Sequence, residues 1–227
     1  MRLLLLVLSL LGASWTTLGA QANQYESAAD SDPEARALLE KLRLKYEGMD
    51  PLEARFTLTL LFPEQPEEVQ EGTLLRSGEK YRVRLGQREI LSDGNALYLI
   101  LHQNKEVQIN DLPEEGEAQG AFSPQAILRL HESDQFVYVM GGRVPRDGRV
   151  LQQIEFKPLD PYADYAKLRM EIDPSSLELV SATAFGKDGS RYIFTLERMA
   201  AKGQVEAGTF SFRESDYPGY YLEDLRQ

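Results

Sequence analysis

Few residues of this chain have the type and the spacing that catalysis or metal binding requires. The sequence contains no cysteine and two histidines, His102 and His131. A serine hydrolase needs its nucleophile in a constrained turn such as G-x-S-x-G, and a zinc site needs several ligands in register. Neither pattern is present in the sequence. We therefore expect both histidines to be structural, and we expect a protein that is not an enzyme and that has no cofactor and no metal.

Acidic residues are abundant, but their positions predict turns rather than proton transfer. The chain has 36 Asp and Glu against 25 Lys and Arg, which gives a net charge of −11. Asp93, Asp147, Asp173 and Asp188 stand in turn dipeptides, where the side chain shapes the turn. The acidic run 111–117 departs from EF-hand spacing, which indicates a solvated loop. Without a basic block, this balance also argues against nucleic acid and against anionic lipid head groups bound by charge.

The start of the chain has the layout of a secretory signal peptide. A basic Arg2 precedes an apolar run over 3–12, and small residues then offer cleavage after Ala20 or Ala22. The run of about ten apolar residues is too short to span about 30 Å of hydrocarbon. No cysteine follows that could be lipidated. We therefore expect a cleaved signal peptide (1–22), a polar linker (23–31) and a single soluble, non-lipidated domain (32–227) in the periplasm.

The domain reads as one helix followed by a long series of strands. Ser31-Asp32-Pro33-Glu34 predicts a helix start, with either Asp32 as N-cap or Ser31 and Glu34 as a capping box. Apolar residues repeat at helical spacing over 33–47, and from Leu52 they alternate with polar residues. We expect a short second helix over 126–130, a turn at Gly141-Gly142, a last strand over 209–212, and C-terminal tyrosines that pin the chain end to the sheet.

About eleven short strands joined by tight turns predict an antiparallel meander, which must curl to manage its edges. The strands offer more apolar surface than two short helices can cover, with examples over 52–62, 95–101 and 135–140. Two explanations remain open at this point. The surface belongs to an ordinary core, or it lines a hydrophobic pocket for a lipid or acyl chain.

Four stretches, taken in their order and spacing, carry a family resemblance. They are the helix followed by Phe56-Thr57-Leu58-Thr59; Gly72-Thr73-Leu74 through Lys80-Tyr81-Arg82 to Ile90-Leu91-Ser92-Asp93-Gly94, with Leu97-Tyr98 after it; Val107-Gln108-Ile109-Asn110 before Ser123-Pro124; and Asp188-Gly189-Ser190-Arg191-Tyr192, then Phe210-Ser211-Phe212 and Tyr217-Pro218-Gly219. Through them the chain, from about Asp32 to Arg226, resembles the outer-membrane lipoprotein carrier proteins, the LolA-like family.

The resemblance implies a mainly β fold, in which a strongly curved, unclosed antiparallel β-barrel carries a helical lid on its concave face. It also implies a monomeric periplasmic carrier. Its cavity would receive the acyl chains of lipoproteins released by an inner-membrane ABC-type transporter and deliver them to an outer-membrane acceptor. Two alternatives stay open: a periplasmic lipid-binding sensor or envelope-stress binding module of the same fold, and a secreted hydrolase with an unrecognised site.

The chain departs from the family at one position that matters for the lid. Many members carry an Arg-Pro pair after the strand that corresponds to 72–76, and that arginine helps to latch the lid. Here the pair is replaced by Ser77-Gly78. The sequence leaves open whether Arg76 or Arg82 takes its place or whether the latch is absent.

Alternation along the strands and helical spacing select the residues expected to line the acyl-chain cavity, with plain core packing as the alternative for each. From the sheet we expect Phe56, Leu58, Leu60, Tyr81, Val83, Tyr138 and Met140. From the helices we expect Leu38, Leu39, Leu42, Ile127 and Leu128. A charge placed at Leu58 or Ile127 should then abolish cargo loading more than it abolishes folding.

Overall fold

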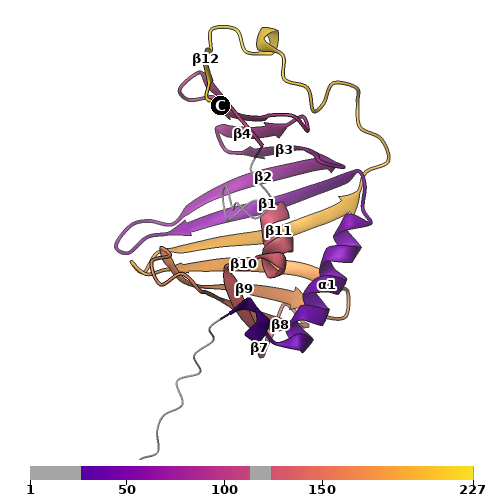
Figure 1. The fold of residues 1–227 in the computed structure, drawn as a ribbon, viewed down its shortest axis with the longest axis vertical. Coiled ribbons are helices and arrows are strands. Elements are labelled where there is room, and N and C mark those ends of the chain that lie inside the picture. The colour runs from indigo at the N-terminus through magenta and orange to yellow at the C-terminus, as the bar shows by residue number, and fades with distance from the viewer. Residues whose placement is uncertain (1–26, 113–123, 227) are drawn as a thin grey trace, which may run out of the picture.

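The computed structural model describes residues 27–112 and 124–226, and Figure 1 shows their arrangement. The expected signal peptide and the beginning of the expected linker lie outside these residues, as do most of the 111–117 run and residues 120–123. The helices are η1 (Ala28–Asp30), α1 (Pro33–Glu47), α2 (Pro124–Arg129), η2 (Leu130–Glu132) and η3 (Glu214–Asp216). Among the described residues, no helix has the length and apolar character needed to cross a membrane.

The strands form one sheet that is antiparallel except at one edge. They are β1 (Leu52–Leu61), β2 (Glu68–Ser77), β3 (Lys80–Leu85), β4 (Arg88–Ser92), β5 (Leu97–Leu101), β6 (Glu106–Asn110), β7 (Phe136–Arg146), β8 (Arg149–Pro158), β9 (Tyr165–Asp173), β10 (Glu178–Gly186), β11 (Arg191–Ala201) and β12 (Tyr221–Asp224). The spatial order is β12-β6-β5-β4-β3-β2-β1-β11-β10-β9-β8-β7. The sheet therefore consists of two meanders joined by the β1–β11 pair, and it is strongly curved and unclosed, with edges at β12 and β7 (Figure 1).

Helix α1 begins where the sequence predicts, and Asp32 is its N-cap. The Asp32 carboxylate accepts hydrogen bonds from Glu34 N at 2.8 Å and Ala35 N at 3.4 Å. These backbone donors lower the pKa of Asp32, the bond from Glu34 contributing most. Ser31 does not cap the helix; its hydroxyl accepts from Tyr138 N at 3.2 Å. The start of α1 is thereby tied to β7.

Two of the sequence predictions about the strands are wrong: the last strand over 209–212 and the turn at Gly141-Gly142. Residues 209–212 form the end of a turn and an irregular segment instead of a strand, because Phe210 and Phe212 pack on a face of the sheet and do not pair at its edge. The edge position belongs to β12, which runs parallel to β6. Gly141-Gly142 lies inside β7, where the pairing with β8 shifts between Met140 and Arg143. The two glycines therefore mark an irregularity within a strand and not its end.

The main core lies between the helices and the half of the sheet formed by β1 and β7–β11. Leu39, Leu42 and Tyr46 of α1 are each 1% exposed and pack in one cluster with Phe136 and Phe156. The Tyr46 hydroxyl accepts a hydrogen bond from Leu179 N at 2.9 Å, and burial raises the pKa of Tyr46 to about 12. In Figure 1, α1 and α2 lie across this half of the sheet.

A second, smaller core lies on the opposite face of β3–β6, under the C-terminal segment (residues 202–226). Phe212 stacks on Tyr98 with ring centroids 4.6 Å apart, and Tyr217 and Tyr220 extend the cluster. The expected pinning by tyrosines holds for these two residues, whereas Tyr221 is 67% exposed. Since the C-terminal segment covers this face, the concave face of the same strands is the one left for a ligand.

Candidate ligand-binding cavity

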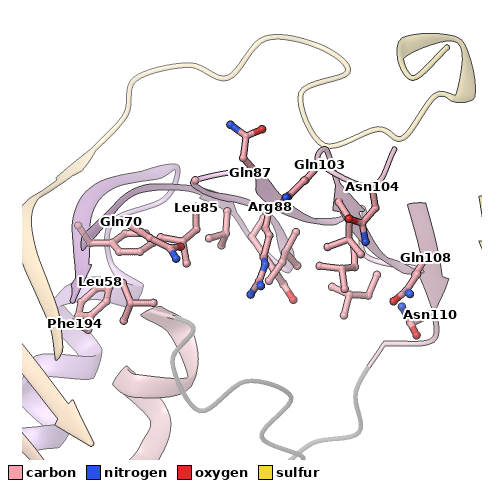
Figure 2. A pocket seen from close by; sticks show the side chains of 18 of the residues that line it. Leu58, Gln70, Leu85, Gln87, Arg88, Gln103, Asn104, Gln108, Asn110 and Phe194 are labelled. Carbon is pink, nitrogen blue, oxygen red and sulfur yellow. The ribbon is translucent and has the colours of Figure 1, made fainter. Parts of the chain in front are cut away.

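A cavity of about 1010 Å³ lies on the concave face of the half of the sheet that includes β1–β6. Figure 2 shows most of the lining side chains on one side of these strands, and Gln87 and the C-terminal segment on the other. Among the described residues, its apolar lining comprises the aromatic residues Phe56, Tyr81 and Phe194 and the aliphatic residues Leu58, Val83, Leu85, Ile90, Leu97, Leu99 and Leu101. Its volume is in the upper part of the range of small-molecule sites, about 300–1,000 Å³.

Strand register explains why these side chains share a face. Residues directly opposite each other on neighbouring strands point to the same side of the sheet. One row across the sheet consists of Ala54, Leu74, Val83, Ile90, Leu99 and Gln108. The next row consists of Phe56, Gly72, Leu85, Arg88, Leu101 and Glu106. Both rows are mostly apolar from β1 to β5 and become polar at β6.

The floor of the cavity near β1 depends on a glycine. The Phe56 ring lies over Gly72, where a Cβ would come within 2.3 Å of a ring atom. Phe56 also packs on Phe194, with ring centroids 4.9 Å apart. Only a residue without a side chain lets the ring lie flat on β2, and this flat ring leaves room above it.

Solved structures share this architecture, although no protein-family model and no curated protein matches the chain. An uncharacterized conserved protein from Thermus thermophilus is 10% identical, with a TM-score of 0.54, over 86% of this chain and 99% of that chain. The two chains therefore share a fold. A LolA superfamily protein from Nitrosomonas europaea is 14% identical over 78% of this chain and 97% of that chain, with a TM-score of 0.43. LprF from Mycobacterium bovis is 13% identical over 78% of this chain and 97% of that chain, with a TM-score of 0.44.

The structure places the expected sheet residues in two groups. Phe56, Leu58, Tyr81 and Val83 line the cavity. Leu60, Tyr138 and Met140 are not among its described lining residues. Tyr138 is 1% exposed in the main core, and Met140 packs against that core. Leu60 is half-buried near the end of β1.

The helix residues lie in the main core, away from the described cavity lining. Leu39, Leu42 and Ile127 are buried there, and Leu38 and Leu128 pack against the same cluster. The physical reason is that α1 and α2 fill the concave face over β1 and β7–β11, so their apolar sides have no free space opposite them. The alternative of plain core packing therefore describes these five positions.

Of the two candidate latch arginines, only Arg76 contacts the helices. Its Nη2 donates to the carbonyl oxygens of Tyr46, at 3.0 Å, and Met49, at 3.2 Å, at the C-terminal end of α1. Arg82 lies on the other face of the sheet, where its Nε is 3.3 Å from the buried carboxylate of Glu89. Arg76 is therefore the side chain that ties the helical cover to the cavity-bearing half of the sheet.

Ion pairs join the two helical segments to each other. Arg43 of α1 contacts Glu40 and Glu47 on its own helix and Glu132 of η2, the last at 3.2 Å. Hydrogen bonding from Arg43, with a smaller contribution from His131, lowers the pKa of Glu40 to about 2. The His131 imidazole Nε2 lies 3.4 Å from Glu40 Oε2. These contacts place His131 in a helix–helix joint.

The other histidine also lies in a structural setting. His102 Nδ1 is 2.9 Å from the Tyr220 hydroxyl, in the second core beneath the C-terminal segment. The two histidines are therefore in different parts of the fold, and neither is among the described residues that line the cavity. Sequence reasoning missed the cavity contributions of β4 and β5, whose alternating leucines and isoleucine were the available signal, and the polar contribution of Gln108 and Asn110 from β6.

Proposed function

We propose that this protein is a periplasmic carrier without a catalytic step, which holds the acyl chains of lipoproteins in its cavity. It takes them from an inner-membrane ABC-type transporter and delivers them to an outer-membrane acceptor. The observation that carries the proposal is the open, mainly apolar cavity on the concave face of β1–β6, which α1 and α2 leave uncovered. The donor, the acceptor and the periplasmic location follow from the family resemblance and from the signal-peptide pattern.

The size of the hydrophobic effect explains why such a cargo needs a carrier. Each methylene moved into water costs about 0.8 kcal/mol, so one acyl chain of about fifteen methylenes costs about 12 kcal/mol to expose. Spontaneous transfer between membranes is then very slow. A cavity that is partly open to solvent binds the chain less tightly than a closed core would, which favours release at the acceptor.

The experiment is native mass spectrometry of the mature protein, purified without detergent from an envelope fraction. We expect a mass increment that corresponds to an acylated lipoprotein. Leu58→Asp, which places a charge on the cavity wall, should remove the increment. Val69→Asp is the matched control, because Val69 is 55% exposed on the other face of the neighbouring strand.

Two results would overturn the proposal. One is a mass without increment that persists after incubation with lipoprotein-loaded membranes and their transporter. The other is an increment from a free lipid that the protein never passes to an outer membrane, which would favour the lipid-binding sensor of the same fold.

A further inference from the structure

Among the described residues that line the cavity, one has a basic side chain, Arg88, at the beginning of β4. Cross-strand register places it between Leu85 of β3 and Leu101 of β5, on the concave face. Figure 2 shows its side chain extending into the cavity, whereas the neighbouring Gln87 points the other way. Arg88 is exposed, so its guanidinium stays solvated at the open side of the cavity and remains accessible to a ligand of opposite charge.

The protein itself supplies no such partner in the parts of the chain that the structure describes. Four other arginines of the sheet have partners: Arg76 contacts the end of α1, Arg82 and Arg84 contact Glu89, and Arg169 contacts Glu155. Arg88 makes no ion pair and no side-chain hydrogen bond with a described residue. It is therefore a cation held at the cavity with all its donors available.

Two acidic side chains on this face of the sheet, Glu106 and Glu68, form hydrogen bonds with glutamines and not with Arg88. Glu106 shares the row of Arg88 but lies two strands away, about 10 Å, with Leu101 between them. Its carboxylate accepts a hydrogen bond from Gln108 Nε2 at 2.7 Å. Glu68, the acidic residue of the cavity lining, accepts from Gln70 on β2.

Neutral amides lie beyond Arg88 and complete a polar end of the cavity. Asn104 and Asn110 line it from the β5–β6 turn and from β6. Amide N–H groups can donate to the remaining oxygens of an anion that Arg88 holds. From β4 to Phe194 on β11 the concave face crosses four strand spacings, about 19 Å, and its lining is mainly apolar, with Glu68 and Gln70 of β2 as the polar exceptions.

We propose that the cavity binds an amphiphile with an anionic head group, a carboxylate or a phosphate ester, which pairs with Arg88 while its acyl chain runs over the apolar floor toward Leu58 and Phe194. This inference rests on the proposed acyl-chain-binding function and adds the chemistry of the polar end. An anionic head group gains a charge-assisted hydrogen bond from Arg88 that a neutral head group does not, so the head group sets both the orientation and the selectivity of binding.

The test uses ligands that share one chain and differ in head group. The protein is first titrated with the fluorescent apolar dye N-phenylnaphthylamine, and the dye is then displaced with dodecanoate, dodecyl phosphate or dodecanol. Because a charge-assisted hydrogen bond at a partly exposed site contributes modestly, we expect the two anions to displace the dye at about tenfold lower concentration than dodecanol.

The variants are Arg88→Gln, which removes the charge, and Arg55→Gln, a control on the other face of β1. Arg88→Gln should abolish the preference for the anions and leave displacement by dodecanol unchanged, whereas Arg55→Gln should keep the wild-type preference. If only one anion is preferred, that result identifies the head group as carboxylate or phosphate ester.

Failure of the inference and failure of the proposed function give different results. If wild type binds the dye but dodecanol competes as well as the anions, or if Arg88→Gln keeps the preference, the assignment of Arg88 is overturned and the acyl-chain cavity stands. If wild type does not bind the dye at all, the cavity does not take apolar ligands and both proposals fall.

Discussion

Replacing Arg76 with methionine tests how the helical cover is held on the sheet. One Arg76 nitrogen donates to two carbonyl oxygens, those of Tyr46 and Met49, where α1 ends. The last carbonyls of a helix lack intrahelical partners and lie at the negative end of its dipole, so a cation is favourable there. Methionine keeps most of the aliphatic packing and removes the charge and the donors.

The loss of folding stability expected for Arg76→Met follows from these contacts. A hydrogen bond from a charged donor contributes about 1.5–3 kcal/mol, and here one nitrogen serves both acceptors. The Tyr46 oxygen also keeps its bond from Met49 N at 3.2 Å. Arg76 Nε is buried without a partner, a cost that methionine relieves. We therefore expect a loss of about 2 kcal/mol, which for a domain of this size lowers Tm by about 4–8 °C.

The assay is thermal unfolding followed by circular dichroism at pH 7. Arg55→Met is the matched control, because Arg55 is exposed on the opposite face of the adjacent strand, and it should change stability by less than about 0.5 kcal/mol. If Arg76→Met unfolds at the same temperature as the control, the two carbonyl contacts do not hold α1, and the assignment of Arg76 as the tie is refuted.

Three further predictions concern the cavity and the core. Leu58→Asp should weaken dye binding at least about tenfold with little change in Tm. Ile127→Asp should chiefly destabilise the fold, because Ile127 is 3% exposed in the main core. The reverse pattern in dye titration and thermal unfolding would contradict the cavity geometry. Gly72→Ala should push the Phe56 ring into the cavity and weaken dye binding several-fold, so an unchanged dissociation constant would count against it. Because burial raises the pKa of Tyr46 from 10.0 to about 12, the unfolded chain ionises first, and stability should fall as the pH rises from 10 toward 12; a flat Tm over this range would disprove the linkage.

Local rules predicted much of the fold because they act between near neighbours in sequence. Asp32 caps α1 because its carboxylate reaches two backbone donors within one turn of helix. Alternation of apolar residues put Phe56 and Leu58 on one face of β1, and both line the cavity. The last strand was misplaced because Phe210 and Phe212 have strand-like spacing, yet they bury their rings on a face of the sheet that only the folded chain provides.

The helix positions show the limit of such rules. Helical spacing correctly identified the apolar side of α1, and Leu39 and Leu42 are buried. It could not say what lies opposite, because that depends on where the helix crosses the sheet. The pairing of β1 with β11, almost the whole length of the domain apart in sequence, places the helices over one half and leaves the other half open.

Arg88 shows most clearly the difference between what the sequence determines and what only the tertiary structure decides. The sequence by itself determined the strands, the apolar faces and the acidic net charge, which argued against anionic head groups bound by charge. Net charge sums over the whole surface, whereas a ligand in a cavity meets only the groups that line it. The register across β3, β4 and β5 decided that one arginine stands among leucines with no described counter-ion. The meander that the sequence predicts makes these strands neighbours, but only the tertiary structure sets their exact register and so the side chains that surround Arg88.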